Sequence, residues 1–241
     1  MAAKPSKTLP PERPDGEQRK SLLSASAESA KFLILLQVSS RVLTFIVNQV
    51  LLRYLSPELL GVSVQLELFM TTILYFSRDS IRTALQRQTT RTQTQAVINL
   101  SLLALPLGVF FAGGLSLFYT RSFASPETAE QPFFLESIGL YALATILELA
   151  AEPWFALAQL RLRYKLRAGA ESAAATVRCI LTCGVTLAAA RGWVEIGGGV
   201  GPLPFAVGQL GYAVVLFGVY WWGVGGEIGE WKLALRGITP R

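Results

Sequence analysis

The chain of 241 residues contains no histidine. Zinc hydrolases, haem proteins and enzymes with a histidine-activated nucleophile usually need an imidazole, so this absence argues against all three classes. Charged residues are scarce too, at 16% of the chain, whereas a usual soluble domain carries about 25%. The two cysteines, Cys179 and Cys183, lie four residues apart in an apolar stretch, a spacing typical of small packing residues on one helical face. We therefore expect neither a metal nor a cofactor.

Hydrophobic residues, in contrast, make up 51% of the sequence, and the mean hydropathy is +0.42. They gather in long stretches, each near the roughly 20 residues that a helix needs to cross the hydrocarbon core. Helix is the expected structure because lipid offers no hydrogen-bonding partner to an open backbone. The sequence thus predicts an all-α, polytopic membrane protein built as a six-helix bundle. The predicted spans are residues 31–52, 59–76, 96–119, 132–157, 172–190 and 200–222.

The basic residues fall almost entirely in every second gap between these stretches. The other three gaps carry roughly one each, namely Arg53, Arg121 and Arg191. Cytoplasmic loops of membrane proteins are enriched in lysine and arginine, so the alternation predicts that both ends of the chain are cytoplasmic. It also accounts for the net charge of +6 without a nucleic-acid partner. The basic gaps hold Lys4, Lys7, Arg13, Arg19, Lys20, Arg78, Arg82, Arg87, Arg91, Arg161, Arg163, Lys165, Arg167, Lys232, Arg236 and Arg241.

The two ends of the chain differ from the apolar middle in composition. Residues 1–20 are polar and hold four prolines, and no secretory signal peptide opens the chain. We expect residues 1–28 to form a disordered cytoplasmic tail and residues 29–223 to form the transmembrane bundle. Residues 224–241 are expected to be a cytoplasmic tail or a truncated linker between lobes.

Polar and ionisable residues inside the spans are the main indication of function. A charge at the bilayer centre costs at least about 2.5 kcal/mol, so such residues usually face a bundle interior or an aqueous cavity. A polar cavity that opens to the cytoplasm is one arrangement that would accommodate all of them. Guanidinium groups bind phosphate oxygens in a bidentate fork, which favours a phosphorylated ligand. The candidate ligand-binding residues are Arg41, Asn48, Glu67, Arg78, Arg82, Glu148 and Glu152.

A purely structural role stays open for several charges near the ends of the spans. Arg78, Asp79 and Arg82 are close enough to the interface to snorkel into water or to pair locally. Arg41, near the middle of the first span, is less easily explained in this way.

Two pairs of charges share a helical face. Glu148 and Glu152 are four residues apart, and Pro153 is expected to loosen the helix beside them. Glu171 and Arg178 are two turns apart on the fifth span. An ion pair of Arg178 with Glu171 or Glu152 would line the cavity or would only fix the packing of the helices.

Several motifs, in order over about residues 25–225, carry a resemblance to a known family. Residues 76–82 (FSRDSIR) are the most recognisable, and residues 148–155 (ELAAEPWF) with Gln159 form a second motif. On these motifs the sequence resembles the eukaryotic endoplasmic-reticulum oligosaccharide translocation family. Further matches are Leu36, Gln37, Val38, Arg41, Thr44, Phe45, Asn48, Leu52, Arg53, Leu55, Ser56, Glu58, Gly61, Glu171, Ser172, residues 205–210, Tyr220 and Trp221.

The resemblance implies a fold related to the multidrug and oligosaccharidyl-lipid exporter superfamily, in which two six-helix lobes enclose a central cavity. It implies translocation of dolichyl-diphosphate-linked oligosaccharide to the lumenal leaflet of the endoplasmic reticulum, for N-glycosylation. Arg41, Arg78 and Arg82 would then hold the diphosphate. Members of the family are about twice as long, so this chain corresponds to the N-terminal lobe, and a second lobe or another copy is an expected partner.

Two other functions stay open. One is a non-transporting accessory protein of the same pathway, which would need the same lipid-binding cavity. The other is an intramembrane enzyme that uses Glu148 and Glu152 as an acid–base pair. Neither a nucleophile nor a histidine accompanies these carboxylates, so we expect no catalytic residue.

Overall fold

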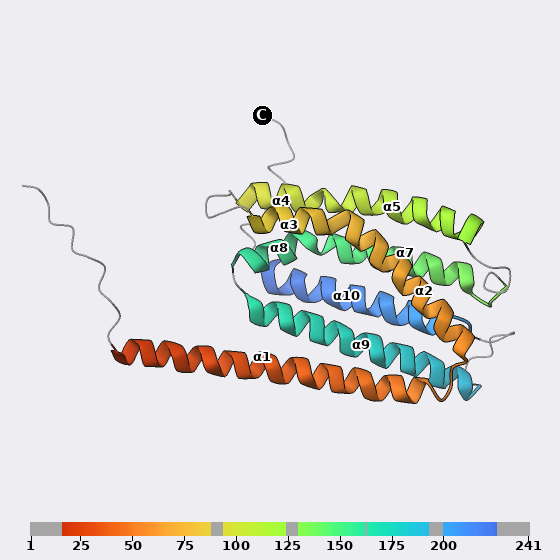
Figure 1. Cartoon of the computed structure of the whole chain (residues 1–241), viewed down its shortest axis with the longest axis horizontal. Coiled ribbons are helices and arrows are strands. Elements are labelled where there is room, and N and C mark those ends of the chain that lie inside the picture. Colours follow the sequence, from red (N-terminus) through yellow and green to blue (C-terminus); the bar gives the residue numbers. More distant parts are fainter. Residues whose placement is uncertain (1–15, 88–93, 124–129, 162, 193–199, 226–241) are drawn as a thin grey trace, which may run out of the picture.

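A computed structural model describes residues 16–87, 94–123, 130–161, 163–192 and 200–225 (Figure 1). Within these ranges the regular structure is helical and no strand is found, which confirms the predicted all-α class. Six helical stretches are long and apolar enough to cross a membrane, as the sequence predicted. These stretches are Leu33–Leu51, Pro57–Ala84, Val97–Arg121, Phe134–Leu160, Tyr164–Ala190 and Leu203–Val224.

The helices begin and end at different residues from those predicted, because helical backbone continues through polar residues beyond the apolar core. The first helix already starts at Gly16, so residues 16–28, assigned above to a disordered tail, are helical. Residues 1–15 and 226–241 of the two predicted tails lie outside the described residues. The elements are α1 (Gly16–Leu51), α2 (Pro57–Leu74), η1 (Tyr75–Asp79), α3 (Ser80–Arg87), α4 (Thr94–Leu102), α5 (Ala104–Phe118), η2 (Tyr119–Phe123), α7 (Phe134–Ala150), α8 (Glu152–Leu160), α9 (Tyr164–Ala190) and α10 (Leu203–Gly225).

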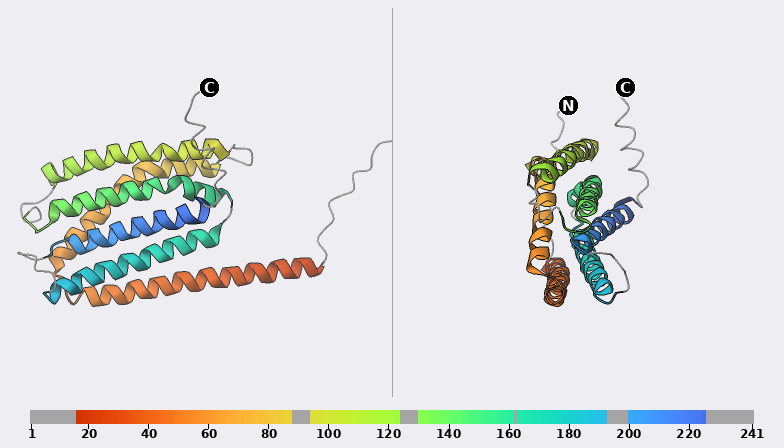
Figure 2. Two further views of the ribbon diagram at one scale, coloured as in Figure 1. Left: turned by 180° about the vertical axis from the view of Figure 1, so that it is seen from behind. Right: turned by 90° about the vertical axis from the view of Figure 1, so that its right-hand side faces the viewer.

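Five of the spans lie in a row, in the order α1, α9, α10, α7 and α5 (Figures 1 and 2). The helix α2 crosses this row diagonally, from the end of α1 towards α5 (Figure 1). The N-terminal part of α1 extends past the other helices, and the part within the bundle packs against α9 (Figure 1). Chain order and spatial order therefore differ, and α1 has α9 as its main neighbour.

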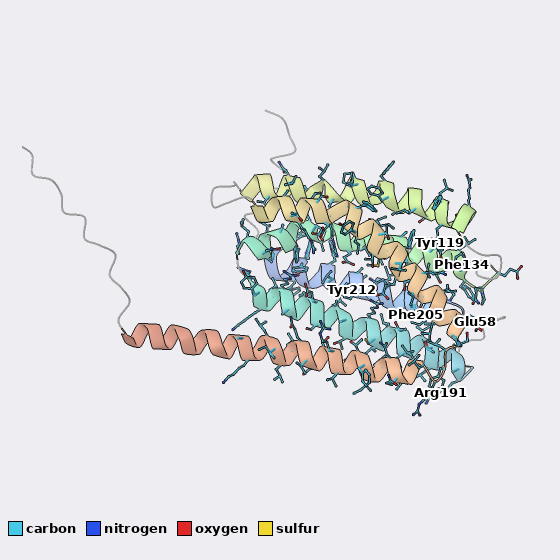
Figure 3. All side chains as sticks on the ribbon, viewed as in Figure 1. Glu58, Tyr119, Phe134, Arg191, Phe205 and Tyr212 are labelled. Carbon is cyan, nitrogen blue, oxygen red and sulfur yellow. The ribbon has the colours of Figure 1, made fainter. Side chains whose placement is uncertain are left out.

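The ends of the helices alternate between the two ends of the bundle. The last residues of α3 and α8 and the first residues of α4 and α9 share one end with the N-terminal half of α1 (Figure 1). The last residues of α1 and α9 and the first residues of α2, α7 and α10 lie at the other end, where Arg191 is labelled in Figure 3. The described residues of the basic gaps thus gather at one end, which we call the basic end.

Local breaks shape the helices near the basic end, and one of them, at Leu103, separates α4 from α5 in the third span. The second span changes from α-helix to the π-helix η1 at Tyr75 and returns to α-helix at Ser80. The fourth span breaks between α7 and α8, where Pro153 lies in the first turn of α8. Proline has no N–H to donate to the carbonyl four residues earlier, so the predicted loosening of this helix is confirmed.

The core consists of two clusters of buried apolar side chains. One joins α2, α5 and α7 around Leu66, Ile73 and Tyr141. The other joins α4, α8, α9 and α10 around Phe155 and Tyr220. The remaining apolar surface is large, as expected for helices that face lipid.

Candidate functional site

The two most recognisable sequence motifs meet near the basic end. Arg78, in η1, and Arg82, in α3, face Glu148, in the last turn of α7, and Glu152, the first residue of α8. Residues 70 or more apart in sequence thus form one cluster, which we call the arginine–glutamate cluster. The π-helix and the break at Pro153 are the local irregularities that flank it.

The geometry of the cluster is that of a charge-assisted network. Arg78 Nη1 donates to Glu148 Oε1 at 2.7 Å and to Glu152 Oε1 at 3.2 Å. Arg82 binds Glu152 with two bonds, from Nε to Oε2 at 2.9 Å and from Nη2 to Oε1 at 2.5 Å. The bidentate fork fixes the plane of the guanidinium group as well as its position.

Burial makes this network strong and costly to break. The Glu148 and Glu152 side chains are each 6% exposed, and those of Arg78 and Arg82 are 22% and 27% exposed. The Arg82 guanidinium also lies 3.9 Å from the centre of the Phe155 ring, a cation–π contact. Two positive and two negative charges sum to zero, so the cluster is neutral without a ligand, although Glu148 Oε2 is buried with no hydrogen-bond partner among the described residues. Neither the snorkelling nor the local pairing considered above describes these two arginines.

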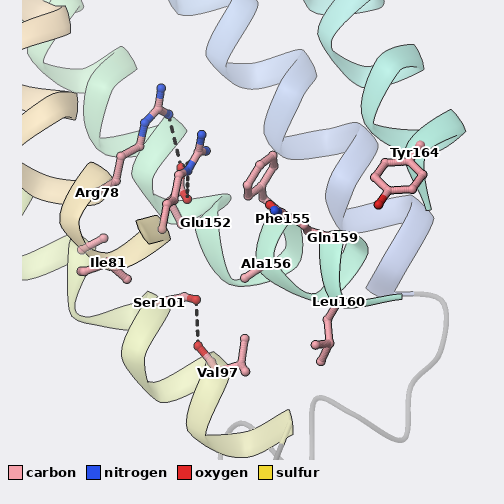
Figure 4. Close-up of a pocket in the computed structure, with 12 residues that line it drawn as sticks. Arg78, Ile81, Val97, Ser101, Glu152, Phe155, Ala156, Gln159, Leu160 and Tyr164 are labelled. Carbon is pink, nitrogen blue, oxygen red and sulfur yellow. Dashed lines mark hydrogen bonds and ion pairs between the residues drawn. The ribbon is translucent and has the colours of Figure 1, made fainter. Parts of the chain in front are cut away.

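Two cavities adjoin the cluster on different sides. The larger, of about 320 Å³, lies between α3, α4 and α8 (Figure 4), and we call it the α4–α8 cavity. The smaller, of about 60 Å³, is lined by Glu148, Glu171, Tyr212 and Tyr220 together with the arginines. Arg78, Arg82, Glu152 and Phe155 line both.

A second pair of cavities lies along α1 and α9, and we call them the α1–α9 cavities. They share Glu171 and Tyr212 with the 60 Å³ cavity. One, of about 490 Å³, is lined by Arg41 and Asn48. The other, of about 450 Å³, is lined by Asn48, Glu67 and Arg178. They share Thr44, Asn48 and Ala175, so they adjoin one another.

The structure therefore divides the candidate ligand-binding residues into two groups. Arg78, Arg82, Glu148 and Glu152 form the arginine–glutamate cluster. Arg41, Asn48 and Glu67 line the α1–α9 cavities instead. The expectation that one diphosphate contacts Arg41, Arg78 and Arg82 together is not matched by a cavity that these three share.

The predicted partners of Arg178, on the fifth span, are wrong. Arg178 Nη2 binds Glu67 Oε1 of α2 at 3.1 Å, rather than Glu171 or Glu152. Glu171 binds Arg167 one turn earlier on α9, at 3.0 Å. The rotation of α9 turns Arg178 towards α2, which a helical period alone does not reveal.

The third predicted ion-pair residue, Asp79, lies in η1 with an exposed side chain. No ion pair of its carboxylate is found among the residues that the structure describes. Its neighbour Arg78 points into the cluster.

Comparison with known proteins places the chain in a family. It matches the family Rft-1, described as "Rft protein", over residues 25–233. The chain belongs to the Rft-1 family. This confirms the resemblance drawn from the motifs.

The relatives of this Rft-1 chain include proteins named Man(5)GlcNAc(2)-PP-dolichol translocation protein RFT1. The one from Yarrowia lipolytica is 36% identical over 220 residues, which cover 83% of this chain and 31% of the relative. The one from Saccharomyces cerevisiae is 31% identical over 229 residues, covering 83% of this chain and 40% of the relative. The match thus spans between three tenths and two fifths of these relatives' length. No solved structure matches it.

Sequence reasoning missed some residues of this Rft-1 chain that line the cavities. Tyr212 lines both the 60 Å³ cavity and the 450 Å³ cavity, and it lies midway along the bundle (Figure 3). Tyr141 lines the larger of the two and is buried. A tyrosine in the middle of an apolar span, away from both interfaces, was the available signal.

Proposed function

We propose that this chain forms one six-helix lobe of a protein that translocates dolichyl-diphosphate-linked oligosaccharide across the endoplasmic-reticulum membrane for N-glycosylation. The names of the relatives and the family match support this function. The orientation follows from the charges, with the basic end and both termini in the cytoplasm.

The observation that carries the proposal is the polar lining of the α1–α9 cavities. Gln37, Arg41, Thr44 and Asn48 follow one side of α1 at helical spacing, inside or beside the first apolar span. Polar side chains on a membrane-spanning helix are costly unless they serve a cavity or a partner. Amide and hydroxyl groups are suitable donors and acceptors for sugar hydroxyls.

Arg41 is the first candidate for the diphosphate. No hydrogen bond or ion pair of its guanidinium is found within the described part of the chain, whereas Arg78 and Arg82 are held by carboxylates. An uncommitted guanidinium can take a phosphate group without first giving up a buried ion pair.

The same geometry argues against an intramembrane enzyme. Glu148 and Glu152 accept short bonds from two guanidinium groups, so proton transfer would require breaking the network. We propose that these carboxylates hold helices together and that the chain has no catalytic residue.

Depletion of the protein in its own cells tests the function. Extraction of dolichol-linked oligosaccharides should show accumulation of the Man(5)GlcNAc(2) intermediate, and glycosylation sites should be under-occupied. Re-expression should reverse both effects. An unchanged lipid-linked pool would contradict the proposal.

Reconstitution separates translocation from an accessory role. The purified full-length protein in vesicles should move labelled lipid-linked oligosaccharide between leaflets faster than empty vesicles do. Binding without faster movement would instead identify an accessory protein, which needs the same cavity. A second lobe facing the α1–α9 cavities, or another copy, belongs to the translocating form.

A further inference from the structure

The α4–α8 cavity is separate from the α1–α9 cavities and has the features of a lipid headgroup site. Its apolar lining includes Ile81 and Val97, and its polar lining consists of Arg78, Arg82, Ser101, Glu152, Gln159 and Tyr164 (Figure 4). We propose that this cavity binds the phosphate headgroup of an anionic glycerophospholipid from the surrounding bilayer.

The arginines keep donors for such a ligand. Arg78 donates hydrogen bonds to the carboxylates only from Nη1, and Arg82 donates them from Nε and Nη2. The other guanidinium nitrogens, Arg78 Nε and Nη2 and Arg82 Nη1, have no hydrogen-bond partner among the described residues. Guanidinium carries five N–H groups, so one side can bind a carboxylate while another binds a phosphate.

The depth of the two arginines matches that of lipid phosphates. Arg82 lies two residues and Arg78 six residues before the end of the second apolar span at Ala84. At about 1.5 Å per residue, these are about 3 and 9 Å along the helix axis. The interfacial region on each side of the hydrocarbon core is about 5 to 7 Å thick, so Arg82 lies within it and the long side chain of Arg78 has only a short way further to reach.

Charge around the cavity favours an anion although the cluster itself is neutral. Tyr164, which lines the cavity, is flanked in sequence by Arg163 and Lys165. These residues lie in a basic gap, and basic residues at a membrane surface attract anionic lipids.

The size of the cavity selects the kind of lipid. About 320 Å³ is at the small end of the range for ligand pockets, enough for a phosphate with its glycerol but not for an oligosaccharide of the kind named in the relatives. The ligand is therefore a small-headgroup phospholipid rather than the translocated lipid-linked sugar.

Melting temperatures of the purified full chain in a neutral detergent test the site. Phosphatidate should raise the melting temperature by several degrees, and phosphatidylcholine with the same acyl chains should raise it much less. The shift should be lost in Arg82→Lys, because a lysine cannot bind Glu152 and a phosphate through one planar group. It should persist in Arg53→Lys, a matched change at the opposite end of the bundle.

A second variant keeps the test decisive if Arg82→Lys does not fold. Gln159→Leu removes a polar group from the cavity without touching an ion pair, and it should also reduce the phosphatidate shift. An equal shift in Gln159→Leu and wild type would overturn the proposal, as would no shift in wild type. A larger shift with dolichyl phosphate than with phosphatidate, dependent on Gln159, would assign the cavity to the translocated lipid instead. All of these outcomes are changes in melting temperature, which report lipid binding and not translocation. A failure of this proposal is therefore distinct from a failure of the proposed function, which is tested by depletion and reconstitution.

Discussion

At the scale of single residues, burial separates the two kinds of ion pair in this chain. The Arg82–Glu152 pair is bidentate and largely buried, while the Arg167–Glu171 pair is more than 40% exposed on both sides. Exposed pairs contribute little because water and salt screen them, whereas a buried charge that loses its partner is strongly destabilising.

A double-mutant cycle on Arg82→Gln and Glu152→Gln measures this difference. Each single variant should lose about 3 kcal/mol of unfolding free energy, because a largely buried charge loses its bidentate partner. In Arg82→Gln, Arg78 Nη1 is the one remaining counter-charge of Glu152 within the described network, at 3.2 Å. The coupling energy should be about 2 kcal/mol. The same cycle on Arg167→Gln and Glu171→Gln should give less than about 1 kcal/mol. Equal coupling in both pairs would show that burial does not set their strength.

Substitution of Arg41, unlike that of Arg82 or Glu152, should impair function without lowering the stability of the protein. Arg41→Gln should change the unfolding free energy by less than about 0.5 kcal/mol, since the side chain is exposed to its cavity. In depleted cells it should fail to clear the accumulated lipid-linked oligosaccharide. Arg53→Gln, in the connection after the same helix, is the control and should restore the pool. Full restoration by Arg41→Gln would remove Arg41 from the binding site.

At the scale of helices, close packing of α9 and α10 depends on a missing side chain. A Cβ on Gly208 would lie 3.0 Å from the Arg178 carbonyl oxygen and would also meet the Thr182 hydroxyl. Small residues let membrane helices approach closely, and the backbone oxygen cannot move aside as a flexible side chain can. Gly208 also helps to fix α9 at the position from which Arg178 reaches Glu67.

Gly208→Leu should therefore destabilise the bundle by about 2 kcal/mol through overpacking. Gly218→Leu on the same helix is the matched control, because its Cβ would meet nothing within 4 Å. Thermal unfolding of the two purified variants gives the comparison. A similar melting temperature for both would mean that α9 and α10 can separate without cost.

At the scale of the whole molecule, the alternation of charge predicts which end faces the lumen. A glycosylation sequon inserted after Arg191 should be modified in cells, because that end of the bundle carries few basic residues. A sequon inserted after Arg161, at the basic end, should stay unmodified. The gel mobility of each variant before and after glycosidase digestion shows whether its inserted sequon is glycosylated. Modification at Arg161 alone would invert the proposed orientation.

The sequence by itself determined the helical class, the number of spans and the family. The number of spans follows from the number of apolar stretches that are long enough to cross the membrane. Each span crosses the bundle once, so gaps that are separated by two spans lie at the same end, and the basic residues in every second gap gather there. Both are properties that can be counted along the chain. The motif of residues 76–82 and that of residues 148–155 could be read in the same way, although not the contact between them.

Only the tertiary structure decided which charges meet. Arg178 binds Glu67, which lies 111 residues away, because α9 packs beside α1 and turns one face towards α2. Arg41 was predicted to hold one diphosphate together with Arg78 and Arg82, but it lines a different cavity for the same reason. The order of helices in space and the rotation of each about its axis are set by packing between distant segments, so no local pattern records them.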